Sequence, residues 1–117
     1  MNWTYPEIFP LSSVSNKHTV LCNESGKYIS YQSDKYGFNN ESRVYEQQSK
    51  NTIVLIGDSF TQGWCVEPSD NIAGQMIKQK FQAINLGNGG SWPLFQYAIL
   101  KEYAANLKPE IILWLYF

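Results

Sequence analysis

Residues 52–60 read TIVLIGDSF, and this stretch decides the fold. Residues 52–56 are β-branched or apolar, which is typical of a parallel strand buried on both faces. Gly57 ends that strand, and Asp58 and Ser59 follow it directly. Open α/β folds keep their active sites at the carboxyl ends of the strands. Ser59 is therefore the leading candidate for a nucleophile.

Helical and extended patterns alternate after this strand. The spacing of apolar residues and the positions of prolines predict a helix over 71–81, a strand over 83–86, a helix over 93–107 and a strand over 111–117. Ser69 or Asp70 is the expected cap of the first helix. The last strand is apolar throughout, so we expect it to be buried on both faces. Such alternation predicts an α/β domain with a parallel sheet and right-handed crossovers.

Residues 1–50 form a polar N-terminal extension with weak periodicity, ahead of the α/β domain at 51–117. Residues 19–22 and 28–31 predict two short strands joined by a turn at 23–26. Residues 33–40 are expected to form a loop around Gly37. A polar connector then leads to the first strand of the α/β domain.

Composition excludes several classes of protein. The net charge of −1 offers no basic patch for nucleic acid. No apolar stretch of about 18 residues predicts a membrane span, and the first residues show no signal-peptide pattern, so the sequence leaves the location of the protein open. The two cysteines, Cys22 and Cys65, make neither a disulfide framework nor a metal site, and we expect two unpaired thiols.

Acyl transfer by a serine needs the hydroxyl, a base usually oriented by a carboxylate, and N–H donors for the oxyanion. Ser59 can supply the hydroxyl and, with its own backbone N–H, one donor. Gly89 or Gly90 can supply a second N–H from the loop after the second strand. The alternative for Ser59 is a cap of a helix or turn. No cofactor motif is present, since the glycine loop does not match G-x-G-x-x-G.

Other polar and aromatic residues have weaker functional interpretations. Asp58 is expected to accept a hydrogen bond within its turn and to orient Ser59, because a metal site would need further carboxylates. His18, the single histidine, is expected to be an ordinary surface residue. Trp64 and Trp92 each follow a loop of the site, so each could wall a pocket or simply pack.

Four segments in order resemble the SGNH hydrolases, the GDSL-type esterases and lipases. Residues 57–63 (GDSFTQG) are similar to the first block of that family, with Phe60 in the place of the usual leucine. Residues 85–90 (NLGNGG) are similar to the second block, whose last glycine, here Gly90, gives an oxyanion N–H. Residues 34–40 (DKYGFNN) are similar to a segment often found ahead of the serine strand in bacterial members. Residues 108–117, which begin with KPE, are similar to the approach to the third block.

The resemblance implies a three-layer α/β/α, flavodoxin-like sheet with strand order 2-1-3-4-5, here truncated after the third strand. It also implies a serine ester hydrolase acting on a small-molecule ester, such as an O-acetylated carbohydrate or a lipid ester. The asparagine of the third block and the Asp-x-x-His of the family do not occur in this sequence. We therefore expect these residues to be inactive alone.

Two other functions fit the same sequence. One is an O-acyltransferase on the same scaffold, and the other is a non-catalytic module that keeps the serine pocket as a ligand site. The third strand would leave one apolar edge unpaired, and an open edge invites pairing with another chain. We expect self-association, instability or dependence on a partner segment.

Overall fold

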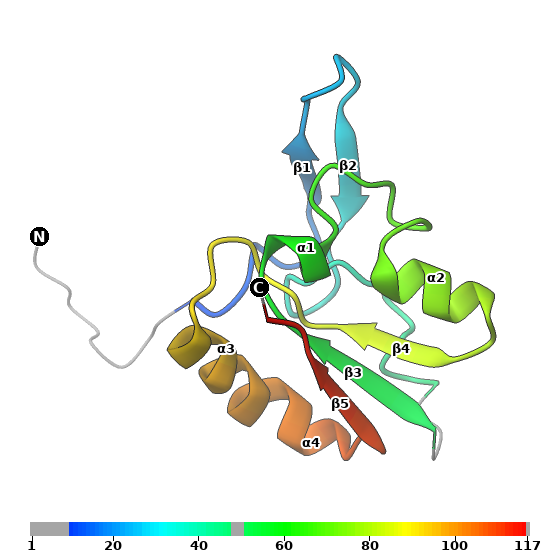
Figure 1. The fold of residues 1–117 in the computed structure, drawn as a ribbon, viewed down its shortest axis with the longest axis vertical. Coiled ribbons are helices and arrows are strands. Elements are labelled where there is room, and N and C mark those ends of the chain that lie inside the picture. Colours follow the sequence, from blue (N-terminus) through cyan, green and yellow to red (C-terminus); the bar gives the residue numbers. More distant parts are fainter. Residues whose placement is uncertain (1–9, 48–50, 117) are drawn as a thin grey trace, which may run out of the picture.

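The computed structural model describes residues 10–47 and 51–116 of the 117-residue chain. Residues 1–9 and 48–50 of the expected extension and Phe117 of the expected last strand lie outside the described residues. Figure 1 shows a mixed α/β fold. Its elements are β1 (His18–Cys22), β2 (Ile29–Gln32), β3 (Thr52–Ile56), α1 (Ser59–Gln62), α2 (Ile72–Lys78), β4 (Gln82–Asn85), α3 (Pro93–Ile99), the π-helical turn η1 (Leu100–Ala104), α4 (Ala105–Leu107) and β5 (Ile111–Trp114).

A parallel sheet with the strand order β4-β3-β5 forms the centre of the molecule. β3 lies in the middle, and all of its residues are buried, as its sequence predicts. The strand order also agrees with the expected order of these three strands, because β3 is paired on both sides. Residues that alternate along β3 face opposite sides of the sheet. The finer expectation of a flavodoxin-like fold stays a prediction.

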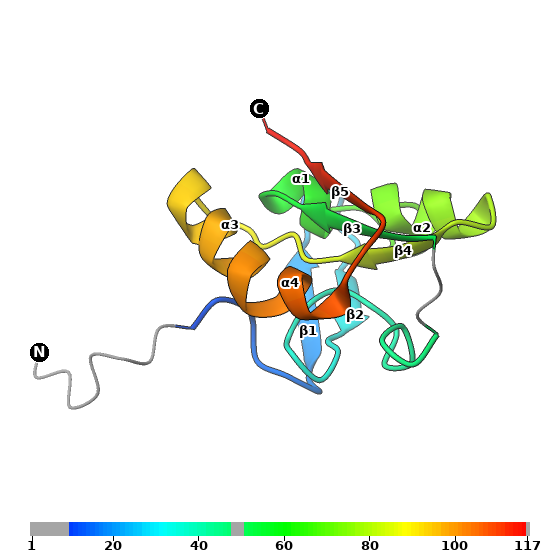
Figure 2. The ribbon, with the colours of Figure 1, turned by 90° about the horizontal axis from the view of Figure 1, so that it is seen from below.

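Two apolar clusters cover the two faces of β3. Val54 and Ile56 belong to a cluster that includes Phe38 and residues of α3 and η1. Ile53 and Leu55 belong to a second cluster, which α2 completes with Ala73 and Met76. Figure 2 shows α2 on one side of the sheet and the β1–β2 hairpin with α4 on the other. Helices therefore shield both faces of the central strand.

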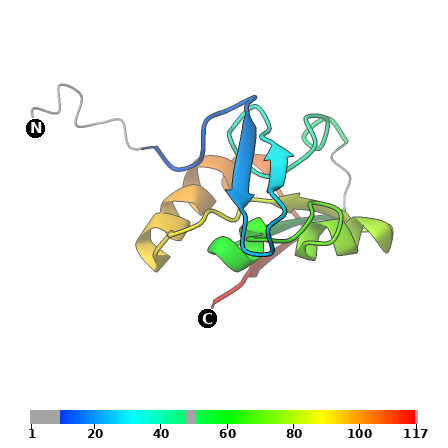
Figure 3. The ribbon, with the colours of Figure 1, turned by 90° about the horizontal axis from the view of Figure 1, so that it is seen from above.

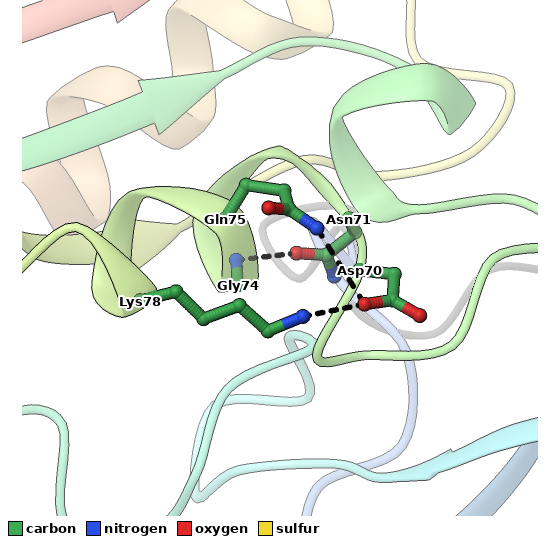
Figure 4. A network of polar contacts seen from close by, with 5 residues as sticks. All are labelled: Asp70, Asn71, Gly74, Gln75 and Lys78. Atoms are coloured by element: carbon green, nitrogen blue, oxygen red, sulfur yellow. Dashed lines mark hydrogen bonds and ion pairs between the residues drawn. The ribbon is translucent and has the colours of Figure 1, made fainter.

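The helices match the predicted positions with different ends. Asn71, rather than Ser69 or Asp70, caps α2, because its Oδ1 accepts a hydrogen bond from the Gly74 N–H at 2.8 Å. Asp70 instead pairs with Lys78 Nζ at 2.6 Å (Figure 4), and this contact lowers the pKa of the Asp70 carboxyl. The predicted helix over 93–107 is continuous through α3, η1 and α4. None of the helices within 10–47 and 51–116 is long and apolar enough to cross a bilayer.

The expectation that the last strand is buried on both faces is wrong. The four residues of β5 are 37–45% exposed. The reason is position, since β5 pairs only with β3 and is an edge of the sheet among the described residues. An apolar edge strand of this kind offers unpaired backbone groups to another strand.

The N-terminal part contributes an antiparallel hairpin, β1–β2, and a buried turn. The hairpin confirms the two short strands predicted there. The segment expected to be a loop around Gly37 is folded on Asp34, whose Oδ1 accepts from the N–H groups of Tyr36 and Phe38. Its Oδ2 accepts from the Tyr45 hydroxyl at 2.6 Å. Burial and the adjacent Asp34 carboxylate raise the pKa of Tyr45, so Tyr45 remains a donor.

Asn40 closes the outer edge of β4. Its Oδ1 accepts from the Asn85 N–H, and its Nδ2 donates to the Asn85 carbonyl, each at 2.8 Å. The side-chain amide thereby satisfies the two backbone groups that a further strand would pair with. The N-terminal segment is thus fastened to the parallel sheet by hydrogen bonds as well as by Phe38 in the core.

The expectation of two unpaired thiols is also wrong, because Cys22 and Cys65 form a disulfide. The hairpin lies against the loop that follows α1 (Figure 3), which brings the two Cα atoms to 5.4 Å. The spacing of two cysteines cannot predict this contact. Two further contacts join the same parts, from Trp64 Nε1 to Glu24 Oε1 at 3.0 Å and from Lys27 Nζ to Glu67 Oε1 at 2.7 Å. The Glu67 contact raises the pKa of the exposed Lys27.

Breaking the disulfide is expected to lower the free energy of unfolding by about 2–4 kcal/mol, because the bond closes a long loop (sequence separation 43). Urea denaturation with and without reductant measures the loss. The double variant Cys22→Ser/Cys65→Ser should match the reduced protein. Free thiols that titrate in the native, unreduced chain would contradict the bond.

Candidate active site

Ser59 lies at the carboxyl end of the central strand. β3 ends at Ile56, and Ser59 is the first residue of α1. Asp58 caps this helix, with its Oδ1 accepting from the Phe60 N–H at 3.0 Å, which is the hydrogen bond within the turn that the sequence predicts. A Cβ on Gly57 would lie 2.1 Å from the Thr61 hydroxyl, so the tight turn requires glycine there.

The loop after β4 meets Ser59 at the same edge of the sheet. Gly90 has the left-handed φ of 73°, which favours glycine. A Cβ added to Gly89 would lie 3.8 Å from the Ser59 Cβ. Ser59 and Gly90 line the same two clefts. The structure therefore brings together the two residues that the sequence singles out from different strands.

Hydrogen bonding distinguishes Gly90 from Gly89. The Gly89 N–H donates to Gln62 Oε1 at 2.9 Å. Over residues 10–47 and 51–116, the N–H groups of Ser59 and Gly90 have no acceptor, and the Ser59 hydroxyl has no partner. Of the two glycines, Gly90 is therefore the one whose N–H can bind a ligand oxygen, beside the N–H and hydroxyl of Ser59.

Two buried polar residues position this loop, and the sequence analysis does not single them out. Gln62 holds Gly89 and also reaches the Tyr31 hydroxyl of the hairpin at 3.5 Å. Asn85 accepts from the Gly87 N–H at 2.9 Å and donates to the Thr61 carbonyl at 2.8 Å. A clue to Asn85 in the sequence is that it is the amide residue near the end of the otherwise apolar predicted strand.

Two clefts flank the Ser59–Gly90 pair. The first, here called the hairpin cleft, has a volume of about 450 Å³ and lies toward β1; it is lined by Ser13, Thr19, Val20, Leu21, Ser59, Gln62, Trp64, Asn88, Gly89 and Gly90. The second, here called the helix cleft, has a volume of about 420 Å³ and lies toward the start of α3; it is lined by Asp58, Ser59, Gly90, Ser91, Trp92, Pro93, Gln96, Leu115 and Tyr116. Each cleft contains one of the two tryptophans noted in the sequence. A ligand can therefore extend to either side of Ser59.

His18 is exposed at the start of β1 and lines neither cleft. No group of three His, Cys, Asp or Glu side chains is placed to hold a metal ion in the part of the chain that the structure describes. Asp58 is engaged in its helix cap. Among the described residues, the site thus holds a serine hydroxyl and two N–H groups, and no histidine lines it.

Two glycine substitutions are expected to differ in cost. In Gly87→Ala the new Cβ would lie 2.4 Å from the Gln62 backbone nitrogen, so we expect a loss of about 3 kcal/mol through overpacking. In Gly90→Ala nothing lies within 4 Å of the new Cβ, and only the left-handed backbone costs about 1 kcal/mol. Urea denaturation of both variants checks the order. Equal losses would contradict the close packing of Gly87 on α1.

Comparison with known proteins does not assign a function to this site. No family model, no curated protein and no solved structure matches the chain. What the site does is therefore inferred from its residues, their contacts and the clefts around them.

Proposed function

We propose that this chain carries the nucleophile and the oxyanion-binding groups of a serine ester hydrolase. The observation that supports this most is the position of the Ser59 hydroxyl, which lies with the free N–H groups of Ser59 and Gly90 where two clefts meet. The substrate is a small-molecule ester, such as an O-acetylated sugar or a lipid ester. The order of the motifs in the sequence, which resembles that of SGNH hydrolases, supports the same class.

The proposed reaction has two steps. Ser59 Oγ forms a bond to the acyl carbon and loses its proton to a base, while the carbonyl oxygen becomes an oxyanion. The Ser59 and Gly90 N–H groups stabilise that oxyanion, and the alcohol then leaves with a proton. Water releases the acyl group from the serine. Removing one such donor typically costs on the order of a hundredfold in rate.

The base is the part that the described residues do not place. The single histidine, His18, lines neither cleft that contains Ser59. A serine without a base is a poor nucleophile. We therefore expect negligible hydrolysis by this chain alone.

An O-acyltransferase fits the same residues, with a sugar hydroxyl replacing water in the second step. The observation that favours it is the pair of separate clefts, which leaves room for an acyl donor and an acceptor on the two sides of Ser59. A non-catalytic ligand-binding module is the other alternative, and the lack of a placed base favours it. A rate that depends on an added sugar acceptor would indicate the acyltransferase. Ligand binding without turnover would indicate the binding module.

Added imidazole is expected to replace the missing base. With p-nitrophenyl acetate, the chain alone should stay close to the buffer rate, and with imidazole the protein should add a rate above that of imidazole alone. Ser59→Ala should abolish this added rate because it removes the nucleophile, whereas Ser25→Ala in the exposed hairpin turn should keep it. Release of p-nitrophenol is followed by absorbance.

One outcome of that assay would count against the proposal, and another against the expected inactivity of the chain alone. An added rate that persists in Ser59→Ala would remove Ser59 as the nucleophile. Hydrolysis without imidazole that is lost in Ser59→Ala would show that the chain already contains a base.

We also propose that the chain self-associates through the edge of β5. The four residues of this strand are more than one-third exposed and apolar, and only one side of the strand is paired among the described residues. Pairing with an edge of a second chain would satisfy the open backbone groups.

A lysine on the edge strand is expected to weaken this association. Leu113→Lys places a charge on the apolar edge and should raise the dissociation constant at least about tenfold, which corresponds to 1.4 kcal/mol. Leu94→Lys is the matched control, since Leu94 is more exposed but lies on α3. Sedimentation velocity measures both. A monodisperse monomer of the unaltered chain would contradict the proposal.

A further inference from the structure

The hairpin cleft is walled by a part of the chain that does not belong to the parallel sheet. β1 and β2 form a separate two-stranded sheet. Yet Thr19, Val20 and Leu21 of β1 line the same cleft as Ser59 and Gly90. The N-terminal hairpin is thus the outer wall of a cleft whose inner wall carries the proposed nucleophile.

The disulfide, an apolar cluster and side-chain hydrogen bonds hold the hairpin in this place. Its own apolar cluster contains four buried residues with Cys65 packed against them, and the disulfide runs through that cluster (Leu21, Cys22, Ile29 and Tyr31). The Glu24 contact holds the Trp64 indole, which itself lines the cleft. Gln62 connects Tyr31 of the hairpin with Gly89 of the glycine loop. The position of the wall relative to Ser59 therefore depends on the Cys22–Cys65 bond and its neighbours.

The residues that line this cleft favour one chemical class of ligand. None of the described residues that line it is charged. It combines the hydroxyls of Ser13 and Thr19 and the amide of Asn88 with the indole of Trp64 and the aliphatic Val20. Hydroxyl and amide groups match the hydroxyl edge of a sugar, and an indole matches its C–H face. A charged head group would find no counter-charge here. The Thr19 hydroxyl already donates to the Lys17 carbonyl and the Asn88 amide to the Leu11 carbonyl, and each side chain can make a further hydrogen bond, which a sugar uses and a long acyl chain does not.

We propose that the hairpin cleft binds a neutral sugar residue of the acylated substrate, with the disulfide-held hairpin as its specificity-determining wall. This rests on the proposed function, because it takes Ser59 as the residue that the bound ester must reach. The volume of about 450 Å³ lies within the range of small-molecule sites.

Fluorine NMR of the chain labelled with fluorotryptophan tests the proposal, with monoacetylated glucose as the probe. Each of the four tryptophan signals is assigned by its Trp→Phe variant. The Trp64 signal should shift saturably with the sugar, while hexyl acetate and glucuronate should leave it unchanged. The Trp92 signal reports on the helix cleft in the same spectra.

Two matched variants test the wall. Val20→Glu places a charge on the cleft lining and should weaken sugar binding at least about tenfold. Val14→Glu places the same charge at an exposed position outside the cleft and should not. The double variant Cys22→Ser/Cys65→Ser should also weaken binding, and the β1 amide signals show whether its hairpin still forms.

The results of these experiments test the sugar subsite, the hairpin wall and the hydrolase separately. A shift confined to Trp92, a Trp64 shift with hexyl acetate alone, or no shift with any probe would overturn the sugar subsite. Unchanged binding by Val20→Glu would overturn the role of the hairpin as a wall. If imidazole gives no added rate in the unaltered chain but the Trp64 signal still shifts saturably with the sugar, the proposed hydrolase is wrong and the sugar subsite remains.

Discussion

The close contact between two backbones is the constraint on which the site depends. The loop after β4 passes so near to α1 that a Cβ on Gly87 would collide with the Gln62 nitrogen. Asn85 fixes this approach by bonding to both partners, accepting from Gly87 and donating to Thr61. Parallel pairing of β3 and β4 brings the two loops to one edge of the sheet. The contact then sets Gly90 beside Ser59, which neither loop could achieve alone.

Several contacts join the N-terminal part to the sheet, and three of them are of different kinds. Asn40 closes the edge of β4, Phe38 fills the core beneath the sheet, and the hairpin is bonded to the loop after α1. The buried Asp34 carboxylate organises the turn that delivers Asn40 and Phe38. Although the sequence of this part is polar, its residues make many specific contacts with the rest of the fold. The hairpin cleft is a product of this packing, since it exists only between the two parts.

The sequence predicted the elements whose causes are local or periodic. The apolar run of β3, the helix that begins at Pro93 and the turn of Asp58 follow from patterns within a few residues. The exposed faces of β5 could not be predicted, because apolar residues look alike whether or not another strand covers them. The pairing of Cys22 with Cys65 depends on a tertiary contact between distant segments. Gln62 was missed for the same reason, since its partners Gly89 and Tyr31 lie far from it along the chain.

Because Cys22 and Cys65 form a disulfide, the structure of the hairpin region depends on the redox state of the environment. Disulfides persist in oxidising environments and are rare where thiols are kept reduced. In a reducing environment the hairpin would lose this covalent link and keep non-covalent contacts, among them the exposed contacts of Glu24 and Glu67 and the 3.5 Å bond from Gln62 to Tyr31. The chain would then have two forms, one with the hairpin fixed by the disulfide and one with the hairpin held more loosely, and the redox state would determine which form is present.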